Sequence, residues 1–93
     1  MLRTELVERL AEDSIGLKKT DVKYIVDIFF DQISGALLRG ERVELRGFGA
    51  FTTKHRPARV ARNPRDGTVI TVKERRFVHF KSGKQLNQIV NDG

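Results

Sequence analysis

Four arginines recur at every third position of the segment "RPARVARNPRDG", which runs from residue 56 to residue 67. They are Arg56, Arg59, Arg62 and Arg65. The planar guanidinium group is always charged, holds phosphate oxygens at two points and fits narrow grooves. The segment has little apolar area to contribute to a core, so its residue types favour anion binding rather than packing.

The centre of this segment is expected to reverse the chain. Asn63 suits the first position of a β-turn, Pro64 suits the second, and Asp66-Gly67 closes the reversal. The flanks "KHRPARVAR" and "TVITVKERR" are extended in character, which predicts a two-stranded ribbon on the order of 25 Å long with the turn at its tip. Val69, Ile70 and Val72 would form an exposed apolar edge of this ribbon. Such an edge needs a partner to cover it.

The positive charge of the chain is concentrated around this ribbon. The 93 residues carry a formal charge of +6. Residues 1–51 hold 8 Lys/Arg against 9 Asp/Glu, a net of −1, whereas residues 52–84 hold 10 against 2, a net of +8, and Asp92 supplies the remaining −1. A basic segment on a nearly neutral body favours nucleic acid as the partner, ahead of an acidic membrane.

Other kinds of chemistry find little support in the residues. The absence of cysteine excludes disulfides and thiolate metal sites, and it fits a reducing compartment. His55 and His79 have no acidic residue nearby at metal-ligand spacing, and "GFGAF" leads into a strand rather than a helix, which argues against a nucleotide loop. No signal peptide or membrane span is apparent. We therefore expect an intracellular, soluble protein with no catalytic activity, metal, cofactor or small-molecule ligand.

Two helices are expected to precede the ribbon. Thr4 is expected to cap the first, Gly16 to make a turn, and the second to run from about Lys19 to Arg39 and to end at Gly40. The second helix is apolar around most of its circumference, which a chain of this length cannot bury alone. We therefore predict a dimer, with a core that includes Ile25, Phe29, Phe30, Ile33, Leu37, Phe48, Phe51 and Phe80.

The helical pair has an alternative interpretation as a helix-turn-helix that reads the major groove. Its recognition helix would then begin with residues that suit a core better than a groove, namely Asp21, Val22, Tyr24, Ile25 and Val26. Only Lys18, Lys19 and Lys23 would meet DNA. A structural helical hairpin is the better reading.

The rest of the chain predicts strands and a final helix. In "ERVELRGFGAFTTKH", Val43 and Leu45 are expected to point inward and Glu44 outward, with a hairpin through "GFG". "RRFVHF" is expected as a further strand, and "SGKQLNQIV" as a helix with a capping box from Ser82 to Gln85. The predicted fold class is α+β in one domain, 1–93, with a helical dimerisation region (1–40), a three-stranded antiparallel body sheet (41–55 and 75–81), a β arm (56–74) and a C-terminal helix (82–91).

The chain contains three motifs, "ERVELRGFGAF", "RNPRDG" and "HFKSGKQL". Together they closely resemble the HU / integration host factor family of bacterial DNA-bending proteins, and the resemblance covers essentially the whole chain. The resemblance implies an intertwined dimer whose arms wrap double-stranded DNA in the minor groove, with Pro64 intercalating between base pairs. It implies a nucleoid-associated protein of the bacterial cytoplasm that contributes to nucleoid organisation, transcription, replication and recombination. The DNA-binding residues that it implies are Arg3, Thr4, Glu44, Arg46, His55, Arg56, Arg59, Arg62, Asn63, Pro64, Arg65, Lys73, Arg75, Arg76, Lys81, Ser82, Gly83 and Lys84.

Glu44 and Arg46 resemble the β-type subunit of integration host factor more than typical HU. This leaves two versions of the dimer open, a sequence-preferring heterodimer with an α-type chain and a homodimer that binds DNA broadly as HU does. The same two residues also fit an outward charge pair on a strand. The chain departs from the family pattern at Val60-Ala61, where Thr-Gly is common, at Val78, where many relatives have proline, and at Lys18, where a serine-like helix cap is usual.

Two further classes remain as alternatives. A small basic RNA-binding protein would need stacking aromatics on an exposed sheet face, whereas four phenylalanines are expected to alternate inward, namely Phe48, Phe51, Phe77 and Phe80. The basic arm of an interaction module would instead dock on an acidic protein.

Overall fold

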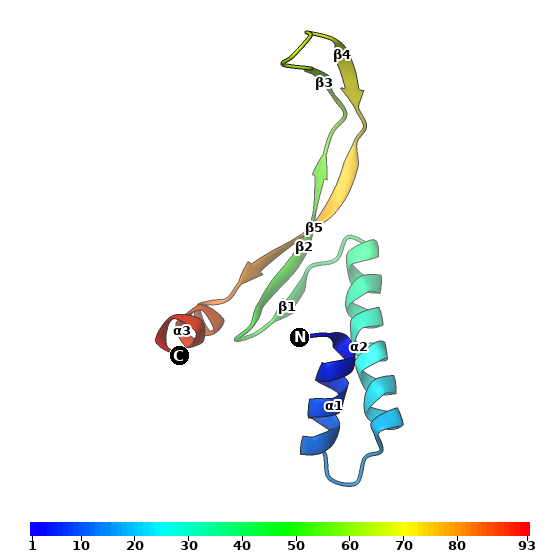
Figure 1. The fold of residues 1–93 in the computed structure, drawn as a ribbon, viewed down its shortest axis with the longest axis vertical. Coiled ribbons are helices and arrows are strands. Elements are labelled where there is room, and N and C mark those ends of the chain that lie inside the picture. Colours follow the sequence, from blue (N-terminus) through cyan, green and yellow to red (C-terminus); the bar gives the residue numbers. More distant parts are fainter. The chain divides into compact units, whose positions relative to one another are not determined.

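The computed structural model describes all 93 residues, from Met1 to Gly93. Its elements, drawn in Figure 1, are α1 (Arg3–Asp13), α2 (Lys19–Leu38), β1 (Val43–Leu45), β2 (Gly49–Arg56), β3 (Arg59–Arg62), β4 (Val69–Val72), β5 (Arg75–Ser82) and α3 (Lys84–Asp92). The fold class is α+β, as predicted. The chain divides into two compact units, which we call the helical unit (residues 1–35) and the arm unit (residues 36–93).

The helical unit is an antiparallel pair formed by α1 and most of α2 (Figure 1). Its buried core is small and consists of Val7, Val22 and Val26, with Ala11 packed against them. Gly16 has a φ of +85°, a conformation that glycine adopts without strain, and it makes the expected turn. A structural hairpin is the reading that this core supports.

The caps of the first two helices differ from the expectation. The prediction that Thr4 caps α1 is wrong, because α1 begins at Arg3 and its N-cap is Leu2, which makes no side-chain hydrogen bond. At the start of α2, the Asp21 carboxylate accepts the backbone N–H of Lys18 at 3.1 Å. This is one half of a capping box, so the helix is anchored even though Lys18 itself has no side-chain acceptor to offer.

The C-terminal end of α2 follows the sequence prediction. Gly40 has a φ of +79°, its N–H bonds the Leu37 carbonyl at 3.0 Å, and the N–H of Glu41 bonds the Ala36 carbonyl at 2.9 Å. These two bonds form a Schellman motif, which explains why the helix stops here.

The arm unit contains a three-stranded antiparallel sheet in the order β1-β2-β5, which we call the body sheet. Phe51 lies opposite Phe80 in the β2–β5 register, and their rings are 4.7 Å apart. Phe77 lies opposite Lys54, and because side chains alternate along a strand it points to the other face from Phe80. The expectation that the phenylalanines all alternate inward is therefore wrong for Phe77.

Two strands, β3 and β4, form a separate antiparallel ribbon. It continues from one end of β2 and β5 (Figure 1), and we call it the arm. Pairing is interrupted between the body sheet and the arm at Pro57-Ala58 on one strand and at Lys73-Glu74 on the other. Proline has no N–H for a ladder, which accounts for the break on the first strand.

The final helix begins later than predicted. Ser82 is the last residue of β5, α3 begins at Lys84, and its N-cap Gly83 provides no side-chain acceptor. The predicted capping box between Ser82 and Gln85 is therefore wrong. The N–H of Gly83 bonds the Phe48 carbonyl at 2.8 Å, and this tertiary bond keeps the chain extended up to Gly83. No helix of the structure combines the length and the apolar character needed to cross a membrane.

Candidate nucleic-acid interface

Only one of the two units carries a net positive charge. The helical unit holds 5 Lys/Arg against 7 Asp/Glu, a net of −2, whereas the arm unit holds 13 against 5, a net of +8. An anionic macromolecule is therefore attracted to the arm unit.

One face of the body sheet is basic. Residue-by-residue pairing of β2 with β5 brings to one face Ala50, Thr52, Lys54, Arg56, Arg75, Phe77, His79 and Lys81, and we call it the basic sheet face. None of its lysines and arginines forms an ion pair. Lys54 and His79 are absent from the predicted binding residues. Lys54 could have been predicted from the sequence, because side chains alternate along a strand and Lys54 therefore shares a face with Arg56.

Phe77 organises the end of the basic sheet face nearest the arm. The guanidinium of Arg56 lies 5.1 Å from the ring centroid and that of Arg75 lies 5.9 Å from it. The two arginines are paired across the strands, an arrangement that like charges disfavour. Stacking on the ring offsets part of this repulsion and leaves the N–H edges of both groups free for phosphate oxygens.

His55 and Arg76 lie on the opposite face of the body sheet and already have partners. His55 Nε2 is 3.1 Å from Glu74 Oε2. Spacing along the sequence did not indicate this acidic neighbour, because the carboxylate lies on the other strand of the ribbon. Arg76 Nη2 donates to the carbonyls of Leu37 and Leu38, each at 3.3 Å. Its charge thus lies at the negative end of the α2 dipole.

The arm presents its arginines to solvent. Arg59, Arg62 and Arg65 are exposed, and none of them forms an ion pair. Lys73, at the base of the arm, is also exposed and unpaired. Pro64 is exposed at the tip.

The apolar residues between the arginines are exposed as well. Val60, Val69 and Ile70 keep 69%, 61% and 53% of their surface accessible. The predicted apolar edge is therefore exposed at Val69 and Ile70, whereas Val72 is half-buried. Both faces of the arm mix guanidinium with apolar surface.

A concavity of about 300 Å³ lies where the β1–β2 turn meets the start of α3. Four cationic residues line it, Arg42, Arg46, Lys81 and Lys84, together with Glu44, Ser82 and Gly83. Because no side chain caps α3, the first N–H groups of that helix are free to bind an anion beside these cations. The structure thus brings most of the predicted body residues together, and it adds Arg42, which sequence reasoning missed.

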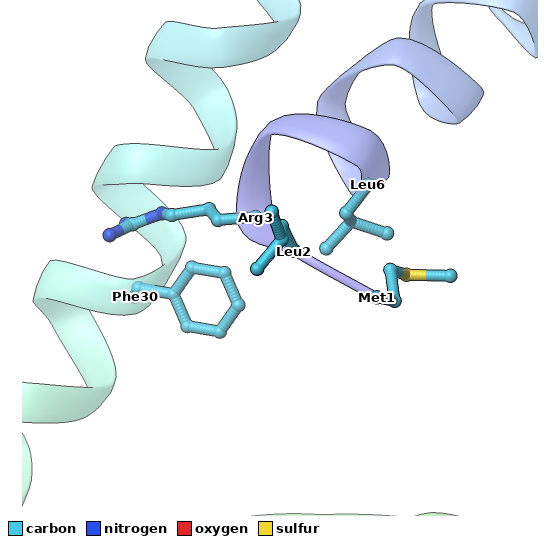
Figure 2. Close-up of a pocket in the computed structure, with 5 residues that line it drawn as sticks. All are labelled: Met1, Leu2, Arg3, Leu6 and Phe30. Atoms are coloured by element: carbon cyan, nitrogen blue, oxygen red, sulfur yellow. The ribbon is translucent and has the colours of Figure 1, made fainter.

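Arg3 and Thr4 belong to the helical unit. Arg3 Nη2 is 3.4 Å from Asp27 Oδ1, and its guanidinium lies 4.7 Å from the centroid of the Phe30 ring. Figure 2 shows Arg3 and Phe30 at the edge of an apolar hollow of about 280 Å³ whose other lining residues are Met1, Leu2 and Leu6. Arg3 is therefore engaged within its own unit, unlike the arginines of the arm.

No group of three or more His, Cys, Asp or Glu side chains is arranged to hold a metal ion. The arrangement that the structure does offer is a set of unpaired cations on the basic sheet face, on the arm and around the start of α3. These groups can bind the phosphates of a nucleic acid.

Comparison with known proteins identifies the family. The profile of the family described as "Bacterial DNA-binding protein" matches residues 1–91. The solved structure of HU from Anabaena, crystallised with DNA, has a TM-score of 0.83 and 29% identity over the full length of both chains. HU from Thermotoga maritima has a TM-score of 0.66 and 32% identity, over 97% of this chain and 98% of that one.

A mutant of transcription factor 1 has a TM-score of 0.66 and 27% identity, over 100% of this chain and 93% of that one. The resemblance that the sequence motifs indicated is thus confirmed at the level of the family. The chain belongs to the bacterial DNA-binding protein family, a family of architectural DNA-binding proteins that includes HU and is not one of enzymes.

Proposed function

We propose that the protein forms a dimer that lays its two arms in the minor groove of double-stranded DNA and bends the duplex by intercalating Pro64. The observation that carries the proposal is the arm itself, a two-stranded ribbon with three unpaired arginines and an exposed proline at its tip. A ribbon of this width fits a nucleic-acid groove, and arginine favours the narrow minor groove. Apolar residues between the arginines suit contact with sugars, and a rigid apolar ring suits insertion between bases.

The body of the protein would hold the flanking DNA. The basic sheet face and the concavity at the start of α3 offer unpaired cations and free helix N–H groups to phosphates that the arm does not reach. Phosphate contacts position a protein without reading sequence, so most of the affinity would be independent of sequence and would fall steeply with salt.

A second copy of the chain, or a related subunit, would cover the apolar surface. Four aromatic residues of the predicted dimer core remain accessible in the single chain, Phe29 at 49%, Phe30 at 37%, Phe48 at 47% and Phe80 at 38%, and Ile25 keeps 54%. Ile33 and Phe51 are half-buried, whereas Leu37 is already buried within the chain. Exposed aromatic area of this extent is typical of an interface rather than of a solvated surface.

Within this function, we propose that Glu44 and Arg46 give a preference for particular DNA sites, as in a β-type subunit of integration host factor. Glu44 lies opposite Ala50, next to the basic sheet face, and with Arg46 it lines the concavity. The test measures the oligomeric state of the purified chain and its affinity for one selected site against random duplex at a fixed salt concentration. A stable homodimer without site preference would instead favour broad, HU-like binding.

Location and class follow from the same proposal. A protein that bends DNA without catalysis would be associated with the bacterial nucleoid and would act in transcription, replication and recombination through DNA shape. RNA binding is less well supported, because the one aromatic ring on the basic sheet face, Phe77, is half-buried beneath two arginines and offers no free stacking platform.

The replacement Pro64→Ala tests the proposed bending directly. We expect the bend measured by energy transfer between the ends of a labelled duplex to fall strongly, while affinity falls by less than about tenfold because the arginine contacts remain. Ala58→Gly, an equally small change at the base of the arm, is the control. An unchanged DNA bend with Pro64→Ala would refute intercalation.

A further inference from the structure

The tip of the arm, residues 63–68, is held by several local hydrogen bonds although all of it except Asn63 is exposed. The N–H of Asn63 bonds the Thr68 carbonyl at 2.8 Å, and the N–H of Gly67 bonds the Asn63 carbonyl at 2.9 Å. The Asn63 side chain accepts the N–H of Arg65 at 2.9 Å. Gly67 has a φ of +72°, which lets the chain close the turn without strain. The turn that carries Pro64 is therefore fixed from its first residue to its last.

Asp66 makes the remaining contacts of the tip. Its Oδ1 accepts both the N–H of Thr68 at 2.9 Å and the hydroxyl of Thr68 at 2.7 Å. These two bonds lower the pKa of the Asp66 carboxyl below its ordinary value of 3.8, so the group is ionised under physiological conditions. The bonds are charge-assisted and correspondingly strong for their length.

A carboxylate at this place opposes the charge of the arm. Arg62 and Arg65 lie close to it in sequence, and no ion pair links Asp66 to either of them. A negative charge at the end of an arm that binds phosphate weakens attraction to DNA. Anion binding therefore does not explain Asp66, whereas its contacts with Thr68 do.

We infer that Asp66 and Thr68 are positioning residues for Pro64, which keep the tip in the conformation that presents the proline ring to a base step. The inference rests on the proposed intercalation. Insertion separates two stacked bases, and a tip that is already ordered loses less conformational entropy when it inserts. Asp66 thus favours the complex in which the DNA is kinked over the complex in which it is not. Its negative charge slightly lowers the affinity for DNA in both complexes.

Three variants separate the two effects of Asp66. Asp66→Ala removes both the acceptor and the charge, Asp66→Asn removes the charge and keeps an acceptor, and Thr68→Val removes only the hydroxyl bond. Glu12→Ala is the charge control, because Glu12 is exposed on α1 and forms no ion pair. Each variant is measured for DNA affinity, for the DNA bend by energy transfer, and for the NMR signals of the tip amides in the free protein.

With Asp66→Ala we expect the ratio of kinked to unkinked complexes to fall about two- to tenfold, the range given by the net loss of one hydrogen bond. The dissociation constant should stay the same or decrease, because a negative charge has left the arm. Opposite signs in bending and affinity are the signature of positioning, since a pure charge effect moves affinity alone. Asp66→Asn should keep most of the bend, and Thr68→Val should lose less of it than Asp66→Ala.

The free protein provides a readout that needs no DNA. Because the pKa of Asp66 is lowered on folding of the tip, the carboxylate stabilises the tip above pH 3.8, and this contribution is lost as the pH falls through the lower, folded-state pKa. The Thr68 amide should therefore titrate with a midpoint below pH 3.8, and Asp66→Asn should abolish that titration.

Two results would overturn the inference in distinguishable ways. If Pro64→Ala reduces the bend but Asp66→Ala does not, the positioning role is wrong and intercalation stands. If Pro64→Ala leaves the bend unchanged, intercalation is wrong and the positioning role falls with it.

Discussion

The two units differ in what their cationic side chains contact. In the helical unit three cations form ion pairs with carboxylates. Arg3 and Lys23 pair with Asp27 at 3.4 and 3.0 Å, and Lys19 pairs with Glu8 at 3.1 Å. Large apolar side chains of this unit are exposed. In the arm unit the arginines of the arm and of the basic sheet face have no acidic partner. The difference teaches that net charge alone does not locate an anion-binding surface. What locates it is the absence of an internal partner for each cation.

The same comparison assigns a partner to each kind of exposed side chain. Exposed apolar area is covered by another protein surface, and unpaired guanidinium groups on a ribbon are covered by phosphates and groove edges. We therefore expect substitutions of the exposed aromatic residues to act on assembly and substitutions of the unpaired arginines to act on DNA binding.

The largest effect should come from an exposed aromatic residue of the helical unit. Phe29→Ala should destabilise the dimer by about 3 to 5 kcal/mol if the ring is buried at the interface, as large truncations in cores do. Analytical ultracentrifugation and the concentration dependence of the melting temperature measure this loss. Tyr24→Ala, which truncates another exposed aromatic of α2, is the control. A dimer that forms as readily as the unmodified protein, with an unchanged melting temperature, would show that Phe29 is not at an interface.

The next effect separates unpaired from paired cations. Removing Arg59 and Arg62 together should weaken DNA binding by on the order of tenfold per residue and should reduce the slope of log affinity against log salt by about two. Removing Lys19 and Lys23 together should have a much smaller effect, because both are engaged with carboxylates. Equal losses in the two double variants would contradict the comparison.

A smaller contrast lies within β5, between two neighbouring arginines. Arg76→Ala should lower stability by about 1 kcal/mol, because Arg76 bonds the last carbonyls of α2. Arg75→Ala should leave stability nearly unchanged and weaken DNA binding, because Arg75 is unpaired and stacks on Phe77. Thermal melts and binding at fixed salt measure both. The reverse pattern would mean that the assignments of the two residues must be exchanged.

Local sequence patterns predicted most elements of the fold because they depend on local chemistry. The αL glycine at Gly40, the turn at Gly47 and the Asn63-Pro64 reversal all follow from residue type and spacing. Residue type also predicted the exposed apolar residues of the arm at Val69 and Ile70, although Val72 is half-buried. The family resemblance then indicated how these local features would act in a dimer and on DNA. The dimer arrangement and the mode of DNA bending are proposals.

The features that sequence reasoning missed depend on tertiary contacts. The late start of α3 results from the bond between Gly83 and the Phe48 carbonyl, thirty-five residues earlier in the chain. The partner of His55 is Glu74, on the other side of the ribbon. Arg76 bonds the end of α2 rather than remaining free. None of these partners is visible from spacing, because each depends on how segments distant in the sequence pack together.

The most direct test of the central claim, that the arm occupies the minor groove, is to map DNA cleavage from a probe on each unit. Because the chain has no cysteine, a single introduced thiol can carry an iron chelate that cleaves nearby sugars. We compare Thr71→Cys, on the exposed arm, with Glu12→Cys, on α1. Strong cleavage from position 71, with the stagger between strands that minor-groove attack produces, and weak cleavage from position 12 are the predicted results. Cleavage from position 12 alone, or a major-groove stagger from position 71, would contradict the account.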